Sequence, residues 1–399
     1  MALKNSYDIA VIGGGPAGTA SAYYAAKLGL KTILFEKQAY PLHKPCGGAL
    51  SPRVIPLLGK EALKTINCEI DELRVFSPSF KCLTINKASG YATRREEFDQ
   101  AMAKDARDAG ANVMDNCRVK TIHQLPAGDF EIVTENTAAA AKYVVLATGF
   151  QKKAFVHSPF IPEEFEEDYL AMTVVSETPV DNELLAAINY PAKIMAIFFG
   201  AVPNGYGWYF VKNGYINIGI GATAMLLKDV GAIKAYQQFI NTLREKGCLP
   251  KDLELKKERA YPLPFKRTVR KSVFGNALLV GDAAGFVSPV TGEGIYYAVK
   301  GAKLAAEAIA RNLKNGTPLS SYHDNWKKDF GHGLDKYGYL LREMLYKNEK
   351  RMEMAVNLGI QDEKMAFLMK NLIYGLCGYE EVLWKAMRRL PITLVKTIF

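Results

Sequence analysis

The fold is decided by Asp8-Ile-Ala-Val-Ile-Gly13-Gly-Gly15-Pro-Ala-Gly18, close to the start of the sequence. The apolar run before the first glycine is typical of a buried parallel strand, and three glycines follow at a one–three–six spacing. The alanine-rich segment 17–28 predicts a helix, and a second apolar run at 32–35 ends in Glu36. This order of strand, glycine turn, helix and strand predicts a βαβ unit that binds a dinucleotide.

Each glycine of this stretch has a separate physical task. Gly13 permits the tight turn out of the strand, Gly15 lets the backbone approach a pyrophosphate, and Gly18 lets the helix pack on the strand. The helix N-terminus attracts the phosphates, and Glu36 stands where an acid accepts hydrogen bonds from the adenosine ribose. NAD and FAD use the same pattern, and a glycine-rich turn in an ordinary βαβ unit is the alternative.

A second glycine-containing turn lies far along the chain. The apolar run 276–280 ends in Gly281-Asp282, and Ser288-Pro-Val-Thr-Gly292-Glu-Gly294-Ile295 follows, opening a predicted helix at 295–312. A strand end that carries an acid, next to a second helix N-terminus, suits the far half of an extended cofactor. For Asp282 alone, the alternative is an ordinary helix cap.

On these two stretches the chain resembles the flavoprotein superfamily built on the aromatic-hydroxylase fold. The resemblance implies that FAD is the cofactor, that Asp282 holds its ribityl chain and that 292–295 lie against the isoalloxazine. It extends to Arg95-Glu-Glu-Phe98-Asp99, whose arginine contacts the ribityl or phosphate side in that superfamily, and to Val119, near the adenine.

The residues that the resemblance assigns to FAD are Gly13, Gly15, Pro16, Ala17, Gly18, Glu36, Lys37, Cys46, Gly47, Gly48, Ala49, Arg95, Val119, Ala147, Gly149, Gly281, Asp282, Gly292, Gly294 and Ile295. One position departs from the pattern. The hydroxylase branch has Ala-Asp-Gly where this chain has Ala147-Thr148-Gly149. The missing carboxylate weakens a monooxygenase assignment.

The loop Tyr40-Pro-Leu-His43-Lys-Pro45-Cys46-Gly47-Gly48 follows the first βαβ unit. Its Pro-Cys-Gly-Gly resembles the geranylgeranyl reductase family, whose members saturate isoprenoid double bonds. The resemblance implies that Cys46 lies in the substrate channel near the reacting flavin edge, as the catalytic residue and a candidate proton donor. A buried inert thiol is the alternative, and His43 is a second candidate donor.

Aromatic residues alternate in Pro203-Asn-Gly-Tyr206-Gly-Trp208-Tyr-Phe210-Val211. Alternation on a strand places Tyr206, Trp208 and Phe210 on one face. The stretch is similar to the family's Pro-x-x-Tyr-x-Trp-x-Phe-Pro motif, with Val211 in place of the last proline, and this implies a substrate-binding wall for a long hydrocarbon. An ordinary sheet core is the alternative.

These patterns predict an α/β fold with a Rossmann-like FAD-binding domain, an inserted antiparallel-sheet substrate domain and a helical C-terminal region. We expect the FAD-binding domain to comprise 1–68, 89–150 and 266–319, the substrate domain 69–88 and 151–265, and the helical region 320–399. An amphipathic helix is expected at 228–246 inside the substrate domain.

Breaks in the helical region are predicted near Gly331, Gly359 and Gly375. Its last fifteen residues, 385–399, carry four basic residues and no acid. Such a segment is typical of a helix that lies on an anionic membrane surface, or of one that caps the substrate tunnel.

The net charge of +10 is spread over the chain without a basic run, which argues against a nucleic-acid partner and suits phospholipid head groups or an acidic electron carrier. Residues 1–6 do not have the pattern of a signal peptide, and no apolar stretch approaches the roughly 20 residues that span a bilayer. Six cysteines without CxxC pairs predict no metal site and a reduced, cytoplasmic protein, with the inner face of the membrane as a possible location.

The sequence therefore predicts an FAD-dependent reductase of carbon–carbon double bonds in geranylgeranyl chains, on membrane ether lipid precursors. It leaves the electron donor open between NAD(P)H and ferredoxin. The alternatives are a flavin monooxygenase or halogenase, and a non-catalytic electron-transfer flavoprotein.

Overall fold

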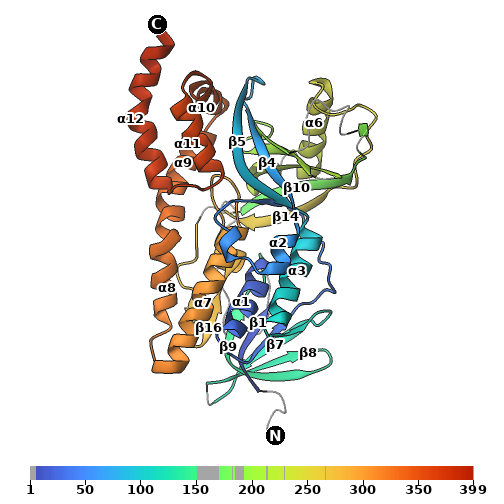
Figure 1. Ribbon diagram of the computed structural model, residues 1–399, viewed down its shortest axis with the longest axis vertical. Coiled ribbons are helices and arrows are strands. Elements are labelled where there is room, and N and C mark those ends of the chain that lie inside the picture. Colours follow the sequence, from blue (N-terminus) through green and yellow to red (C-terminus); the bar gives the residue numbers. More distant parts are fainter. Residues whose placement is uncertain are drawn as a thin grey trace.

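The computed structural model describes residues 6–398, apart from 127, 151–169, 182, 185–192, 213, 229 and 266. It contains two eight-stranded sheets and a set of C-terminal helices, which confirms the predicted fold class (Figure 1). The part of the predicted substrate domain at 151–169, and residues 1–5, lie outside the described residues.

The first sheet forms the dinucleotide-binding half of the molecule. Its main path is β15-β16-β9-β1-β2-β6, with the β7–β8 hairpin attached to β9. The strands are β1 (Ser6–Ile12), β2 (Thr32–Phe35), β6 (Asn112–Met114), β7 (Val119–Gln124), β8 (Phe130–Thr134), β9 (Ala138–Leu146), β15 (Val273–Phe274) and β16 (Ala277–Leu279). Because Ile12 pairs in parallel with both Phe35 and Leu146, the carboxyl ends of three strands meet at one edge.

Three helices pack together against this sheet. α1 (Pro16–Lys27) contacts both α3 (Arg95–Asp108) and α7 (Ile295–Asn315). Small side chains allow this close packing. Seven residues of α1 between Ala17 and Ala25 are buried, and all of them are Ala, Gly, Ser or Thr. The predicted helices at 17–28 and 295–312 are confirmed, and α7 continues to Asn315.

The second sheet follows the order β14-β10-β13-β12-β11-β4-β5-β3. Its strands are β3 (Ala49–Leu50), β4 (Ile66–Phe76), β5 (Cys82–Thr93), β10 (Leu170–Pro179), β11 (Ile194–Phe199), β12 (Tyr206–Lys212), β13 (Tyr215–Thr223) and β14 (Arg259–Pro264). Every pairing is antiparallel except that of β11 with β4. The predicted antiparallel layer is therefore present, with one parallel pair in it.

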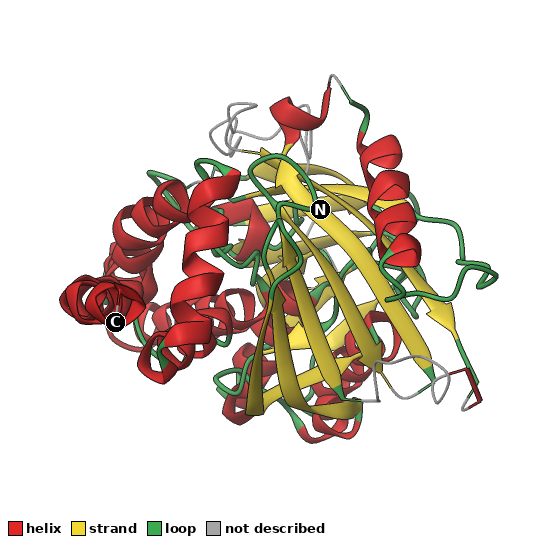
Figure 2. Ribbon diagram, turned by 90° about the horizontal axis from the view of Figure 1, so that it is seen from above, coloured by secondary structure: helices red, strands yellow, loops and turns green. Residues whose placement is uncertain are grey.

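The two faces of this sheet are covered differently. α6 (Ala232–Glu245), the predicted amphipathic helix, packs on one face, and the C-terminal helices lie on the other (Figure 2). Tyr209 and Val211 belong to the core under α6, whereas Trp208 and Phe210 belong to the core that faces the C-terminal helices. The predicted alternation along β12 is thus confirmed. The remaining short elements are η1 (Ile55–Leu57), α2 (Lys60–Lys64), α5 (Ala224–Lys228) and η3 (Gly281–Ala284).

The C-terminal region is helical, as predicted, and it breaks near Gly359, at the extended residue Asp362, and near Gly375, but the break expected near Gly331 is wrong. Its elements are α8 (Ser320–Trp326), π-helical η4 (Lys327–Gly331) and η5 (Gly333–Gly338), α9 (Tyr339–Tyr346), α10 (Glu349–Gln361), α11 (Glu363–Ile373) and α12 (Tyr379–Ile398). Gly331 and Gly359 lie within helical structure, where a Cβ would come within 2.6 Å of the Trp326 ring and 2.5 Å of Leu83. They permit close packing, and only Gly375, with φ +61°, follows a helix end.

No helix in the part of the chain that the structure describes is long and apolar enough to cross a membrane. Over the same residues there is no group of three or more His, Cys, Asp or Glu side chains that could hold a metal ion.

One buried carboxylate fixes α12 to the other C-terminal helices. Asp362 caps α11 by accepting a hydrogen bond from the Lys364 N–H at 3.0 Å, and it is 3% exposed. It also accepts hydrogen bonds from Arg389 Nε at 2.6 Å and Thr393 Oγ1 at 2.7 Å, both on α12. These hydrogen bonds hold the pKa of Asp362 well below its ordinary value.

We predict that Asp362→Ala lowers the free energy of unfolding by about 3 kcal/mol, because it leaves Arg389 without its charged partner. Urea unfolding, together with trypsin cleavage after Lys385 and Arg388, measures the effect. Since the folded-state pKa is depressed, the contribution of Asp362 is complete above about pH 4 and is lost as the pH falls below that value. The matched control is Asp71→Ala, which removes an exposed ion pair with Lys193. Equal effects of the two substitutions would contradict the anchoring role.

Candidate active site

A first cavity of about 210 Å³ lies at the carboxyl ends of β1, β2 and β9, where doubly wound sheets bind ligands. The predicted cofactor residues that line it are Gly13, Gly15, Pro16, Ala17, Glu36, Lys37, Cys46, Arg95, Val119, Ala147, Gly149, Asp282, Gly292, Gly294 and Ile295. The two stretches that are far apart in the sequence therefore meet around one cavity.

The remaining predicted cofactor residues do not line this cavity. A Cβ on Gly18 would lie 1.8 Å from the carbonyl oxygen of Gly13, and one on Gly281 would lie 2.7 Å from the Ala17 Cβ, so both pack behind its wall. Gly47, Gly48 and Ala49 line a second, neighbouring cavity instead.

The glycines at the start of α1 form a cradle. Gly13 has φ +106°, and a Cβ there would lie 2.4 Å from the Ala147 carbonyl oxygen, so only glycine fits. Gly15 differs, because a Cβ there would meet no atom within 4 Å and would project into free space. No side chain caps the N-terminus of α1. The open space and the exposed helix end fit a pyrophosphate.

Glu36 is a buried acid at the end of β2. Its two carboxylate oxygens accept hydrogen bonds from the N–H groups of Gly14 at 2.6 Å and Gln38 at 3.0 Å. Because each oxygen can accept more than one hydrogen bond, the carboxylate stays available to ribose hydroxyls. The structure thus holds Glu36 rigidly where the fingerprint requires an acid.

Basic residues surround the cavity. Arg95 forms a bidentate pair with Asp99, at 2.9 and 2.8 Å, and this pair raises the pKa of Arg95 although burial alone would lower it. Lys44 and Arg118 also line the cavity, and the sequence interpretation missed them. They are single basic residues in loops, so no spacing marks them. Burial, followed by the nearby Lys44, lowers the pKa of Lys37.

Asp282 lines the other side of the same cavity. Burial raises the pKa of its carboxyl group, and Lys44 and Arg95 act in the opposite direction. A buried carboxylate beside cations is suited to accept hydrogen bonds from the hydroxyls of a polar chain. The donors, the acid and the phosphate cradle together fit FAD.

A second cavity of about 400 Å³ lies between the second sheet and helices α9–α12. Its lining is mainly apolar and includes Met195, Ile197 and Phe199 of β11 and Leu383, Ala386, Met387 and Leu390 of α12. The start of the predicted terminal segment therefore closes this cavity. The side chains from 394 onward lie outside the described residues.

The two cavities share part of their lining: Pro45, Cys46, Leu263, Gly292, Gly294 and Ile295. Cys46 is thus placed at the junction, where its Sγ accepts a hydrogen bond from the Gly48 N–H at 3.3 Å. His43 lines neither cavity, and its ring contacts Glu96. Of the two candidate proton donors in this loop, only Cys46 faces the junction.

The aromatic wall forms one side of the second cavity. Tyr206, Trp208 and Phe210 all line it. A Cβ on Gly47 would lie 2.8 Å from the Phe210 ring, so the loop with Cys46 packs directly on the wall. The Tyr206 hydroxyl donates a hydrogen bond to the Thr291 carbonyl oxygen at 2.5 Å, and burial raises its pKa.

Comparison with known proteins defines the class first. The family model described as FAD binding domain matches residues 6–329, so the protein is a flavoprotein of that family. A geranylgeranyl diphosphate reductase of Rhodobacter capsulatus is 30% identical over 379 residues, covering 90% of both chains. A digeranylgeranylglycerophospholipid reductase of Methanococcus vannielii is 29% identical over 365 residues, covering 87% of both. The chain belongs to the geranylgeranyl reductase family of FAD-dependent oxidoreductases.

Two further comparisons concern an uncharacterised relative and the fold. An uncharacterised protein of Methanosarcina barkeri is 30% identical over 353 residues, covering 87% of this chain and 86% of that protein. The solved structure of a geranylgeranyl bacteriochlorophyll reductase-like protein of Thermoplasma acidophilum superposes with a TM-score of 0.80 at 22% identity, covering 96% of this chain and 99% of that one. This likeness shows that the fold is shared.

We predict that Gly15→Ala weakens FAD binding by roughly 10- to 100-fold, since its methyl group projects into the space of the pyrophosphate. The apoprotein should unfold at an unchanged temperature, because this methyl group meets no protein atom. Fluorescence titration of the apoprotein with FAD measures the affinity. Gly378→Ala is the matched control, since Gly378 also has open space and lines neither cavity. Unchanged FAD affinity in Gly15→Ala would contradict the cradle.

Proposed function

We propose that the protein is an FAD-dependent reductase that saturates carbon–carbon double bonds of geranylgeranyl chains on membrane ether lipid precursors. The observation that carries the proposal is the mainly apolar cavity that meets the dinucleotide cavity at Cys46. A compact polar pocket would suit hydroxylation of a small aromatic substrate. A mainly apolar space suits a hydrocarbon chain.

The lining supports this choice of substrate. Leucine, methionine and aromatic side chains give a long chain apolar contact without hydrogen bonds that it cannot satisfy. Polar lining residues are few, among them Ser51, Asn204, Arg342 and Arg351. The relatives named above are reductases of a geranylgeranyl diphosphate and of a digeranylgeranyl phospholipid, which differ in their polar ends and share the geranylgeranyl group.

Reduced FAD, when bound, supplies the hydride that adds to one carbon of the double bond, and it is oxidised in this step. The chain must then bind the alkene over the junction, exclude water and deliver a proton to the second carbon. In this proposal the Cys46 thiol gives that proton and regains one from solvent. The Gly48 N–H donates a hydrogen bond to Cys46 Sγ and so orients the sulfur atom.

The likeness to monooxygenases and halogenases does not supply a second candidate function. A flavin-dependent brominase shares the fold with a TM-score of 0.71 but is only 16% identical. Thr148 stands where the hydroxylase branch has an aspartate. An electron-transfer subunit binds no small-molecule substrate, so that function does not account for the apolar cavity. We therefore argue only for the reductase.

We predict that dithionite-reduced protein, mixed anaerobically with a digeranylgeranyl ether phospholipid, forms saturated product while its flavin is reoxidised. Lipid mass spectrometry and absorbance near the flavin maximum follow the two events together. NADPH, NADH and reduced ferredoxin, offered in turn, identify the donor. Cys46→Ala should slow product formation roughly 100-fold or more, as is typical of a lost general acid, and should keep its FAD.

Cys82→Ala is the control for this experiment, because Cys82 is exposed and lines neither cavity. Absence of saturated product from every substrate and donor would overturn the reductase assignment. Rapid oxygen consumption with an aromatic substrate would point to a monooxygenase instead.

The proposal includes membrane association, at the cytoplasmic face, through the C-terminal helices. Ten of the fifteen exposed large apolar side chains among the described residues lie between Tyr339 and Ile392. Met344, Met354 and Met387 are both exposed and part of the cavity lining, so the cavity reaches this surface. Basic residues accompany them and slightly outnumber the acidic residues of the same span; they include Lys347, Lys350, Lys364, Lys370, Lys385 and Arg388. Apolar contact together with basic charge favours an anionic bilayer surface.

We predict that Phe367→Ser combined with Trp384→Ser reduces binding to phosphatidylglycerol vesicles at least tenfold, since each exposed side chain contributes about 1.5 kcal/mol or more on insertion. Vesicle co-sedimentation measures the binding. The control pair is Leu28→Ser with Met225→Ser, which removes equally exposed apolar groups elsewhere. Equal losses from both pairs would contradict a specific membrane surface.

A further inference from the structure

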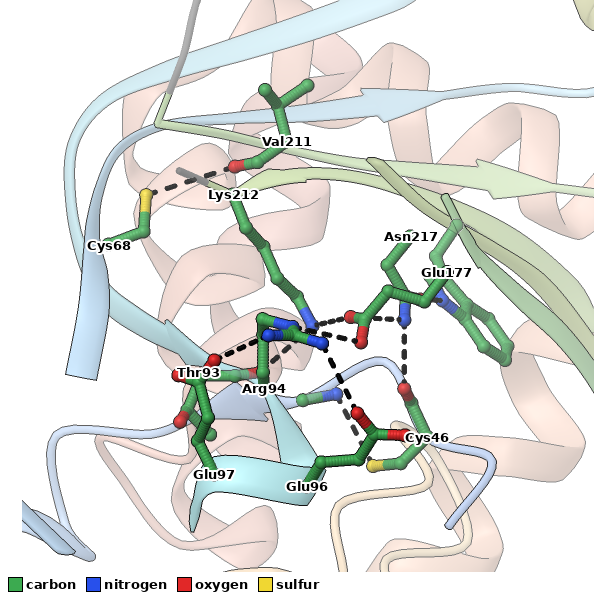
Figure 3. A network of polar contacts seen from close by, with 12 residues as sticks. Cys46, Cys68, Thr93, Arg94, Glu96, Glu97, Glu177, Val211, Lys212 and Asn217 are labelled. Atoms are coloured by element: carbon green, nitrogen blue, oxygen red, sulfur yellow. Dashed lines mark hydrogen bonds and ion pairs between the residues drawn. The ribbon is translucent and has the colours of Figure 1, made fainter. Parts of the chain in front are cut away.

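A buried polar network lies directly behind the Cys46 loop (Figure 3). Lys212, at the end of β12, is fully buried and ends in a charged ammonium group. Its Nζ donates hydrogen bonds to Glu177 Oε1 of β10 at 2.7 Å and to the Thr93 carbonyl oxygen of β5 at 2.9 Å. A fully buried lysine is rare, so its location requires a reason.

Asn217 of β13 joins this ion pair to the active-site loop. Its side-chain amide is 1% exposed and donates hydrogen bonds to the Cys46 carbonyl oxygen at 3.0 Å and to Glu177 Oε1 at 3.2 Å. Its Oδ1 accepts a hydrogen bond from Trp208 Nε1 at 2.8 Å. One amide therefore connects the aromatic wall to the loop that carries the thiol, and both of its N–H groups are used.

The Lys212–Glu177 pair favours the same orientation of this amide as the Trp208 N–H and the Cys46 carbonyl oxygen do. Because Lys212 donates to Glu177 Oε1, that oxygen is an anionic acceptor and attracts the N–H side of the Asn217 amide. Turning the amide over would place its oxygen against the Glu177 carboxylate and its NH₂ against the Trp208 N–H. Both contacts would be repulsive, so the network holds a single orientation.

The loop is held at further points by the same group of strands. The Thr93 N–H donates to the Gly48 carbonyl oxygen at 2.9 Å, and a Cβ on Gly48 would lie 2.7 Å from Lys212 Nζ. Glu177, Lys212 and Asn217 line neither cavity, so they reach the substrate only through other residues. A buried ion pair is often no more stabilising than apolar residues of similar size. Fixing a geometry is therefore a better account of this network than stability.

We propose that Asn217 is a positioning residue for Cys46, and that the Lys212–Glu177 pair supports the orientation of the Asn217 amide. The role of Cys46 in catalysis rests on the function proposed above, whereas the position of its thiol is measurable without that reaction. The network aligns the thiol with the junction of the two cavities, where the second carbon of the alkene would lie.

The first test measures thiol reactivity in the oxidised holoprotein. Asn217→Asp keeps the acceptor for Trp208 but turns an oxygen toward the Cys46 carbonyl and Glu177, which repels the loop. Iodoacetamide labelling of Cys46, read by peptide mass spectrometry relative to exposed Cys82, should accelerate roughly fivefold or more, as expected for a loop that opens locally. Asn217→Ala carries the same test if the aspartate variant does not fold.

The matched control is Ser176→Ala. Ser176 precedes Glu177 on β10, and its side chain lies on the other side of the strand. The substitution removes a buried hydrogen bond of 2.5 Å between Ser176 Oγ and the Tyr236 hydroxyl. This substitution should leave the ratio of Cys46 to Cys82 labelling unchanged. An unchanged ratio in the Asn217 variants, or an equal rise in Ser176→Ala, would overturn the proposal.

The second test uses turnover. Asn217→Asp should lower kcat roughly tenfold or more while KM stays within about twofold, because positioning affects the reacting geometry and not the uniform binding of the lipid. In a Cys46→Ala background, Asn217→Asp should lower kcat only slightly further, since the thiol that Asn217 positions is absent. Fully additive losses would indicate a structural role and overturn the proposal. If the wild type reduces no lipid while the labelling ratio responds, the proposed function fails and the positioning role stands.

Discussion

The structure depends on the close contact of α1 with the ends of β1 and β9. Gly18 lies against the Gly13 carbonyl and Gly13 lies against Ala147, and at both positions a Cβ would overlap backbone atoms. This contact fixes the start of α1 over the edge where three parallel strands end. In the proposed cofactor site it therefore sets where the pyrophosphate of FAD would bind and, through the length of the extended dinucleotide, where the far end of the cofactor would lie.

The place of the far end of the dinucleotide is linked to the arrangement of the two cavities. Residues of the turn 292–295 line both the dinucleotide cavity and the apolar one, so the proposed reaction would take place at their junction. The second sheet supplies one wall of the apolar cavity and α9–α12 supply the opposite one. Asp362 holds α12 in place through Arg389, and α12 contributes part of the lining of the apolar cavity.

Features that depend on local sequence could be predicted. The glycine fingerprint, the acid Glu36 and the alternation along 206–210 each follow from backbone geometry, and each occurs where it was expected. The break expected at Gly331 was misjudged because glycine can either end a helix or permit close packing, and only the neighbouring Trp326 ring reveals the second use. The sequence alone cannot distinguish these two uses.

Features that arise from long-range packing could not be predicted. Lys44 and Arg118 stand alone in loops, and the partners of Lys212 come from strands far away in the sequence. The size of the apolar cavity depends on how two layers meet, and no periodicity encodes that distance. From the sequence alone, Lys212 is expected to be a polar residue at the end of a strand. Its burial becomes visible only when β5 and β10 are placed beside it.

The apolar substrate proposed above would explain why a polar network lies behind an apolar wall. A hydrocarbon chain offers the protein no hydrogen bonds, so shape alone decides where along the cavity each double bond lies. Selectivity for one carbon then requires that the reacting groups of the protein stay fixed while the chain slides. Cys46 is fixed through its backbone carbonyl by Asn217, and the wall is fixed through Trp208 by the same amide. Linking both to one side chain keeps the distance between the wall and the thiol constant, whichever part of the chain is bound.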